Sequence, residues 1–551
     1  MITRRAFAGG ALSAAATLQL PGRAFAQTAA APALQAALDA IAAYAEAHRR
    51  YVGLPGLTIG LSLPDGTSRT MSLGYADVAA RTAIGSDTLF QIGSISKLIN
   101  AAVLQQLAAE GRLAFTDRVS ALLPEAQLPA GNAITVQHLL DHVAGIPADA
   151  PLGRPLWTAY APGQHWHYSN TGYVILGKLM EKVGSKPLSQ LLDERIFRPL
   201  GMTRTLGAIR EADRARYAKG YQPADGVPYI PGAPLSEARW IDEDDAAGGV
   251  ASTAADINRL MRSLADAAQG RGGLGLPPAL ARTFTTHAVP SDTPGMTYGN
   301  ALMHVANAGR NYLHHTGGMV SFSSSFHLDI ASGAAAFASA NIGYLAEYRP
   351  RLLTRFAADA LTNAMTAKRP PTPPPIRVIL PVPAAYTGRF NGPAGSFDVR
   401  VSNHALSIVS GGQSAALVPV GGDLFRTTHP AFRRYSLLFE RRGGTIAGVS
   451  WGSLSWLRAG IGGTLAPSNP QLARLSGTYN NPSPWFGTQH IVERGGKLWI
   501  GTETPLTSIG DNLWRVGEEP WSPERASFAN FVNGRPGTFI WSGESFARND
   551  G

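Results

Sequence analysis

The stretch FQIGSISK, residues 90–97, places Ser94 three residues before Lys97. At the start of a helix, side chains at positions i and i+3 lie on one face, so this spacing sets a hydroxyl beside an amine. A serine hydroxyl is a weak nucleophile unless a base takes its proton, and a lysine kept neutral by burial can be that base. The apolar run LINAAVLQQL at 98–107 predicts a buried helix around Lys97. The stretch therefore predicts an activated serine.

Two later elements complete an ordered set with this serine and lysine. A Tyr-x-Asn element spans residues 168–170, and residues 315–318 read HTGG. The order Ser-x-x-Lys, Tyr-x-Asn, Lys/His-Thr-Gly resembles that of the penicillin-recognising serine hydrolases. The text LLDHVAGIP at 139–147 and AGGVAST at 247–253 agrees with the branch that contains class C β-lactamases, D-aminopeptidases and related esterases. The resemblance covers about residues 32–366.

The resemblance implies three catalytic residues. Ser94 attacks a carbonyl carbon, and Lys97 and Tyr168 exchange its proton. Which of the two is the acylation base stays open. The backbone N–H groups of Ser94 and Gly318 are expected to form the oxyanion hole, aimed at the charge that develops on the carbonyl oxygen.

Three further residues are expected to bind substrate: Asn170, His315 and Thr316. Asn170 either orients the substrate amide or stabilises Lys97, with a structural role in capping a turn as the alternative. Residues 315–318 should form an edge strand that faces Ser94. Many relatives have a lysine where this chain has His315, and histidine is mostly neutral at pH 7. This difference disfavours a dedicated β-lactamase or carboxypeptidase, whose substrates carry a carboxylate there.

The Tyr-x-Asn pattern occurs three times, at Tyr168, Tyr298 and Tyr479. Tyr168 is preferred because it lies between the other two elements and is followed by TGYVILG, as in the resembled family. Tyr298 is interpreted as an aromatic residue of a strand. Tyr479 belongs to a β repeat described below.

The pattern of apolar residues predicts an α/β (α+β) domain, with an antiparallel sheet flanked by helices and a helical lobe. Its strands come from both ends of the domain, and most helices come from the middle. The expected helices are residues 32–50, 134–142, 171–184, 187–196 and 344–367, and the expected strands are residues 56–63, 69–76, 297–306, 311–314, 320–329 and 334–342.

The chain repeats itself after a proline-rich linker. Gly388 and Phe390 recur as Gly477 and Tyr479, and both copies consist of short alternating strands with Gly-rich turns. This predicts two small antiparallel β-barrel domains, an architecture similar to that of the D-aminopeptidases, and we expect them to limit access to the site. Core packing is preferred over sugar stacking for their tryptophans. The predicted limits are 1–26 for an export signal, 27–367 for the hydrolase-like domain, 368–383 for the linker, and 384–460 and 470–549 for the barrels.

The first 26 residues are typical of an export signal. They contain the pair Arg4-Arg5, a weakly apolar stretch and an Ala24-Phe25-Ala26 cleavage pattern, which together predict twin-arginine export to the periplasm. No other stretch reaches the roughly 18 apolar residues of a membrane span. With no cysteine and no basic run in 551 residues, neither a thiolate site nor a nucleic-acid partner is expected.

No metal or other cofactor is expected. His138 and His142 lie four residues apart, but no glutamate lies between them as in H-E-x-x-H. They are interpreted as wall or core residues, and so are His165 and His167.

These observations predict an exported serine hydrolase that works through an acyl-enzyme. The resemblance implies that its substrates are amide bonds of short peptides, D-residues included. A carboxylesterase or weak β-lactamase of the same family is the alternative. A non-catalytic penicillin-binding or sensor protein is the alternative from another class. The substrate and the oligomeric state stay open.

Overall fold

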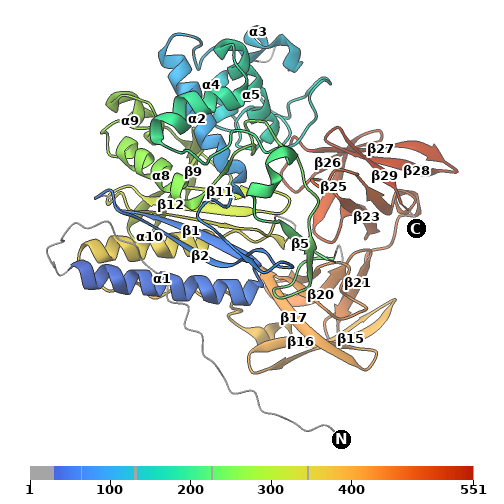
Figure 1. Cartoon of the computed structure of the whole chain (residues 1–551). Helices are drawn as coiled ribbons and strands as arrows, with labels where there is room; N and C mark the ends of the chain where they lie inside the picture. Colours follow the sequence, from blue (N-terminus) through green and yellow to red (C-terminus); the bar gives the residue numbers. More distant parts are fainter. Residues whose placement is uncertain (1–29, 64, 130–132, 225–226, 344–345, 550–551) are drawn as a thin grey trace, which may run out of the picture.

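A nine-stranded antiparallel sheet forms the centre of the hydrolase-like domain (Figure 1). The computed structural model describes residues 30–63, 65–129, 133–224, 227–343 and 346–549. The strand order is β3-β2-β1-β13-β12-β11-β10-β9-β8. The strands are β1 (Gly56–Ser62), β2 (Ser68–Asp77), β3 (Thr82–Ala83), β8 (Val289–Pro290), β9 (Met296–Gly299), β10 (Leu302–Asn307), β11 (Arg310–Gly318), β12 (Ser323–Asp329) and β13 (Ala335–Ala340).

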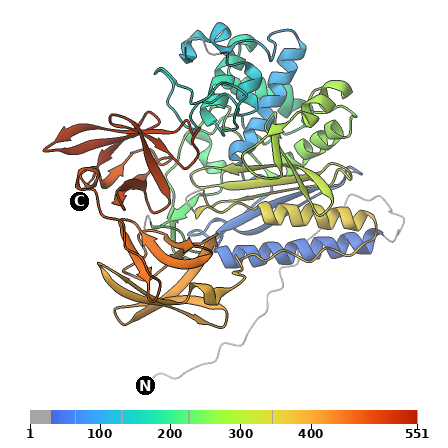
Figure 2. The same ribbon diagram turned by 180° about the vertical axis from the view of Figure 1, so that it is seen from behind.

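Helices cover both faces of this sheet. On one face, α1 (Ala30–Val52) packs against α10 (Arg351–Met365), as Figures 1 and 2 both show. On the other face, α8 (Ala254–Ala268) packs on β1 and β13. The central strands β1, β12 and β13 are buried along their whole length, because layers of helices exclude water from both sides.

A helical lobe stands on the α8 side of the sheet. Its apolar core is continuous with that face of the sheet and includes Leu98, Leu176 and Phe326. The helices are α2 (Ser96–Ala109), α3 (Val119–Leu122), α4 (Val136–Leu140), α5 (Asn170–Gly184), α6 (Leu188–Leu192), α7 (Arg198–Leu200) and α9 (Pro278–Thr286). Two separate two-stranded sheets also form, one from β4 (Phe90–Gln91) and β7 (Ala251–Ser252) and the other from β5 (Tyr221–Pro223) and β6 (Leu235–Glu237).

The C-terminal part forms two closed eight-stranded antiparallel barrels. Phe390 and Tyr479, which recur in the repeat, are each fully buried in the first strand of their barrel. Trp456 and Trp514 also lie in the barrel cores. The first barrel comprises β14 (Gly388–Gly392), β15 (Gly395–Ser402), β16 (Ala405–Ser410), β17 (Gln413–Gly421), β18 (Leu424–Thr427), β19 (Leu437–Arg442), β20 (Thr445–Trp451) and β21 (Leu454–Arg458). The helical turn α11 (Pro470–Ala473) precedes β22 (Gly477–Asn480), β23 (Thr488–Arg494), β24 (Lys497–Ile500), β25 (Thr504–Gly510), β26 (Leu513–Val516), β27 (Arg525–Val532), β28 (Arg535–Trp541) and β29 (Glu544–Arg548).

Contacts join the barrels to each other and to the hydrolase-like domain. Arg494 of the second barrel donates to the carbonyl of Gly452 in the first. Arg426 of the first barrel donates to Glu347 and to the carbonyl of Tyr229. Both barrels therefore lie along one side of the domain (Figures 1 and 2).

The predicted fold class is confirmed, with differences at element ends. The strand expected over 297–306 is two strands, because Asn300 and Ala301 take φ values of 49° and 63° and form a tight turn between β9 and β10. The helix expected from residue 344 begins at Arg351. Pro350 disfavours a helical conformation at the residue before it, so the helix starts after this proline. Residues 1–26, with the predicted export signal, lie outside the described residues.

Candidate active site

Two glycines let the turn that carries Ser94 rest directly on β11. Ser94 lies in the short helical turn η1 (Gly93–Ile95), immediately before α2. Gly93 has a φ of 55°, and a β-carbon on it would lie 2.7 Å from the backbone nitrogen of Gly318. A β-carbon on Gly317 would lie 1.9 Å from the carbonyl oxygen of Ile92. Neither position can hold a side chain without displacing Ser94.

The Lys97 amine is fully buried and lies beside the Ser94 hydroxyl. Its Nζ is 3.1 Å from Ser94 Oγ, 2.7 Å from Asn170 Oδ1 and 2.8 Å from the carbonyl oxygen of Ala247. A neutral amine has two N–H groups and one lone pair. When Asn170 and Ala247 accept the two N–H groups, the lone pair faces the hydroxyl of Ser94. This geometry suits removal of the serine proton.

Asn170 contacts the lysine, and its neighbour caps the helix. The Ser169 hydroxyl accepts from the backbone N–H of Gly172 at 3.0 Å and so caps α5. Asn170 instead accepts from Lys97 and donates from Nδ2 to Asp149 Oδ1 at 2.8 Å. The surrounding protein disfavours charge on Asp149 and raises the pKa of its carboxyl, although the hydrogen bond from Asn170 acts in the opposite direction.

Tyr168 is half-buried in the same cleft as Ser94. The Lys97 Nζ lies 5.0 Å from the centre of its ring, and the ring packs on His142 with 4.2 Å between ring centres. No hydrogen bond joins the Tyr168 and Ser94 hydroxyls in the described residues. The phenol is therefore placed next to the Ser94–Lys97 pair without a direct bond to it.

A buried chain of hydrogen bonds links the Tyr-x-Asn and HTGG elements. The N–H of Ser169 donates to His142 Nδ1 at 3.1 Å, which leaves the His142 proton on Nε2, 3.2 Å from the Tyr298 hydroxyl. Tyr298 then donates to His315 Nε2 at 3.2 Å, and His315 Nδ1 donates to the carbonyl of Thr316 at 2.6 Å. Burial lowers the pKa of His142 well below its usual range, so this chain uses neutral rings.

The HTGG element extends past the neighbouring strand. β11 lies between β10 and β12, so it is an inner strand of the sheet, but its last paired residue on the β10 side is His314. Beyond that point, up to Gly318, it pairs with β12. Met319 donates to Phe322 across that hairpin, and the alternation of an antiparallel ladder turns the N–H of Gly318 the other way, toward Ser94.

His315 is neutral, and a different residue brings a cation to this strand. Its ring is buried, and burial lowers its pKa to about 3, although the bond to Thr316 opposes the shift. Both ring nitrogens are engaged, so the ring supports the wall of the cleft. The guanidinium of Arg349 lies over Gly318, since a β-carbon there would be 2.3 Å from Nη2.

One large cleft contains the candidate residues and is closed on one side by the barrels. It is lined by Ser94, Tyr168, Asn170, Thr316 and Gly318, together with residues of both barrels. From the first barrel come Arg426, Arg434, Tyr435 and Ser436, and the second barrel contributes Trp485, Glu503, Glu524 and Glu544 among others.

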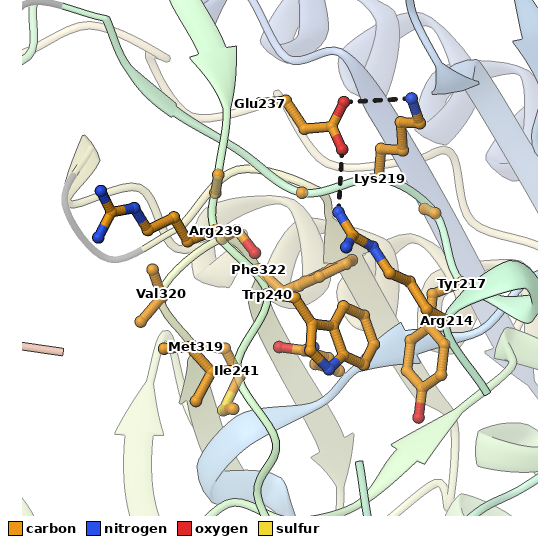
Figure 3. A pocket seen from close by; sticks show the side chains of 15 residues that line it. Arg214, Tyr217, Lys219, Glu237, Arg239, Trp240, Ile241, Met319, Val320 and Phe322 are labelled. Atoms are coloured by element: carbon orange, nitrogen blue, oxygen red, sulfur yellow. Dashed lines mark hydrogen bonds and ion pairs between the residues drawn. The ribbon is translucent and has the colours of Figure 1, made fainter. Parts of the chain in front are cut away.

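A smaller pocket lies nearby (Figure 3). Glu237 accepts from Lys219 and Arg214 at its rim, and Trp240 and Tyr217 pack edge to face. This pocket contains none of the predicted site residues, so the large cleft is the candidate active site. No group of three histidine, cysteine or acidic side chains is placed to hold a metal in the part of the chain that the structure describes.

Several contacts of this site could not be predicted from the sequence. The carbonyl of Ala247, the carboxylate of Asp149 and the hydroxyl of Tyr298 all belong to it. Tyr298 is a buried strand aromatic of β9, as interpreted, but it also joins the two motifs. His165 and His167 contact the second barrel at Trp521 and Glu524. The AGGVAST text was the single available signal for Ala247.

The fold and the Ser94–Lys97 arrangement define a protein of the β-lactamase/transpeptidase-like class. The family model described as Beta-lactamase matches residues 41–360, and the chain belongs to this family. The predicted family is therefore confirmed.

Individual relatives match parts of the chain. The β-lactamase of Escherichia coli (strain K12) is 28% identical over 222 residues, which cover 38% of this chain and 56% of that protein. Penicillin-binding protein 4* of Bacillus subtilis (strain 168) is 27% identical over 221 residues, which cover 35% of this chain and 48% of that protein. The chain thus spans about half the length of these curated relatives. The octameric penicillin-binding protein homologue from Pyrococcus abyssi shares the fold, with a TM-score of 0.55 and 21% identity over 76% of this chain and 100% of that one.

Proposed function

We propose that this protein is a serine hydrolase that works through an acyl-enzyme. The observation that carries the proposal is the buried Lys97 amine, which contacts Ser94 Oγ, Asn170 Oδ1 and the carbonyl oxygen of Ala247. Ser94 Oγ attacks the substrate carbonyl carbon, and its proton passes to Lys97 or to Tyr168. The carbonyl oxygen receives the N–H groups of Ser94 and Gly318 as its negative charge develops. The proton then goes to the departing amine or alcohol, and water releases the acyl group from Ser94.

The proposed substrates are amides of short peptides, including peptides with D-residues. Carboxylates gather on the Asn170 side of the cleft, where Asp149 lies within electrostatic range of Glu524 and Glu544. Such a wall favours a substrate amine. The barrels close the cleft on one side, which favours short chains over long ones.

A second candidate, hydrolysis of β-lactams, is favoured by Arg349. The neutral ring of His315 does not supply the positive charge that would attract a substrate carboxylate. The Arg349 guanidinium over Gly318 supplies one at the same strand. Substrates with a carboxylate next to the scissile amide therefore remain within the proposal, whereas a purely non-catalytic sensor has no need of the Ser94–Lys97–Asn170 contacts.

A panel of chromogenic substrates tests the proposed function. It comprises p-nitroanilides of D- and L-amino acids, p-nitrophenyl esters and a chromogenic cephalosporin, each assayed with the wild type and with Ser94→Ala. Covalent labelling by a serine-directed phosphonate is expected in the wild type and is expected to vanish in Ser94→Ala. Label that persists at full stoichiometry in this variant would show that the nucleophile is another residue.

We also propose that the chain is exported by its first 26 residues. The support is the Arg4-Arg5 pair and the A-x-A pattern at 24–26. Among the described residues, no helix is long and apolar enough to cross a membrane. N-terminal sequencing of the protein recovered from the periplasm should begin at Gln27, and a start at Met1 would contradict the proposal.

A further inference from the structure

A carboxylate of the second barrel enters the hydrolase-like domain. Glu524 lies immediately before β27, and its side chain is only 14% exposed. Its Oε1 accepts from the backbone N–H of Ala148 at 2.7 Å and lies 2.9 Å from His167 Nε2. Its Oε2 accepts from the Ser542 hydroxyl, in the same barrel, at 2.5 Å. One side chain thus ties two separate segments of the hydrolase-like domain to the barrel.

Both tied segments lead directly to the residues around Lys97. Ala148 is followed by Asp149, which accepts from Asn170, and Asn170 in turn accepts from Lys97. His167 precedes Tyr168. Glu524 therefore binds the chain one residue away from Asp149 and one residue away from Tyr168, on the two segments that flank the lysine.

The Glu524 carboxylate is held in its charged form. Burial alone would raise its pKa, but the hydrogen bonds from His167, Ser542 and Ala148 outweigh burial and lower the pKa below its usual range. Hydrogen bonds to an ionised acceptor are roughly twice as strong as neutral ones. Loss of this charge would therefore loosen both segments together.

Other contacts hold the second barrel against the hydrolase-like domain without involving Ala148 or His167. Trp157 Nε1 donates to the carbonyl of Pro523 at 2.8 Å, and the guanidinium of Arg525 lies 5.0 Å from the centre of the Trp157 ring. His165 stacks on Trp521 with 4.5 Å between ring centres. Because these contacts do not involve Glu524, a substitution of Glu524 can leave the barrel docked.

We propose that Glu524 is a positioning residue of the active site, which holds the Ala148–Asp149 segment and the His167–Tyr168 segment against Lys97. The second barrel then completes the hydrolase site as well as covering it. This inference rests on the proposed function. It also explains why the site residues of the first domain depend on a part of the chain more than 350 residues away.

The test compares three variants of the full chain. Glu524→Gln removes the charge but keeps the size of the side chain. Glu518→Gln changes an exposed glutamate of the same loop and serves as the matched control. Trp157→Phe removes the bond to Pro523 and weakens docking without touching Ala148 or His167. Each variant is assayed for kcat and KM with a small p-nitrophenyl ester, for the rate of phosphonate labelling of Ser94 and for thermal unfolding.

Glu524→Gln should lower kcat and the labelling rate together by about tenfold or more, with KM changed less than twofold, because misplacement of supporting groups slows chemistry more than it weakens binding. Glu518→Gln should match the wild type, and Trp157→Phe should lower the unfolding temperature with a smaller loss of kcat. Wild-type rates in Glu524→Gln overturn the inference. An equal loss of kcat in Trp157→Phe also overturns it, since docking alone would then explain the effect. Labelling that persists in Ser94→Ala would instead refute the proposed function.

Discussion

Replacement of Lys97 by methionine isolates the chemistry of its amine. Methionine has a similar length and no hydrogen-bonding group, so it can fill the buried site that Lys97 occupies with 0% exposure. The substitution removes the amine that lies 3.1 Å from Ser94 Oγ. It also leaves Asn170 Oδ1 and the carbonyl of Ala247 without their donor.

The expected effect on rate is large and the effect on stability is small. Loss of a general base lowers kcat by about 10²–10⁴-fold, equivalent to about 2.7–5.4 kcal/mol. An unpaired buried acceptor such as the Ala247 carbonyl costs about 1–3 kcal/mol of unfolding free energy. The desolvation of the Lys97 amine, which the variant no longer requires, offsets part of that cost. The unfolding temperature should therefore change by a few degrees at most.

The assay measures kcat for a p-nitrophenyl ester and the rate of phosphonate labelling in parallel. Lys178→Met is the matched control, since its side chain is 61% exposed on α5 and pairs with Glu181 on the protein surface. Tyr168→Phe should also lower kcat by about 10²-fold. The kcat of the Lys97→Met/Tyr168→Phe double variant should fall by less than the product of the two single losses, because both groups move the same proton. A folded Lys97→Met with kcat within threefold of the wild type would refute this mechanism, and strictly multiplicative losses would rule out a shared proton relay.

Three further changes test other parts of the structure. Arg349→Gln should raise KM about tenfold for carboxylate-bearing substrates and leave neutral esters unchanged, since it removes a charge-assisted contact; equal effects on both classes would exclude this role. Gly317→Ala should lower kcat by about 10²-fold or more, because the new methyl group displaces the Ile92 carbonyl and with it Ser94. Full activity in a variant whose crystal structure shows the alanine in place would contradict the tight packing. Burial lowers the pKa of His48 and of His314 to about 4 in the folded protein, whereas the pKa of a histidine in the unfolded chain is about 6.5. Between pH 6.5 and pH 4 the unfolded state therefore binds more protons than the folded state. The free energy of unfolding should then decrease as the pH is lowered, by up to about 1.4 kcal/mol per pH unit for each ring. His48→Phe should reduce this dependence of the unfolding free energy on pH. Unfolding temperatures that do not fall between pH 7 and 5 would count against buried neutral rings.

Local patterns were sufficient for most of the fold. The helix of residues 30–52 and the strands β1 and β2 follow from apolar periodicity, and the barrel repeat follows from Gly and aromatic spacing. The ends of elements were less predictable. The split between β9 and β10 depends on positive φ angles at Asn300 and Ala301, and neither residue type requires such an angle.

The candidate site could be predicted from the sequence where its residues lie close together in the chain. Ser94 and Lys97 lie three residues apart, so their proximity follows from residue types and intervals alone, whereas the place of Asn170 beside them was implied by the family resemblance. The orientation of His315 does not follow from residue types and intervals, because the sequence does not reveal that its ring would turn into the core against Tyr298.

The amino-acid sequence by itself determined the family, the order of the three motifs and the presence of two β-barrels, because each is written in residue types at fixed local intervals. Only the tertiary structure decided that Ala247 holds Lys97, that Arg349 lies over Gly318 and that Glu524 reaches the site from the second barrel. These contacts join residues that lie from 31 to 376 positions apart in the sequence. Their proximity results from how sheet, lobe and barrels pack together, and such packing leaves no periodicity or spacing in the chain.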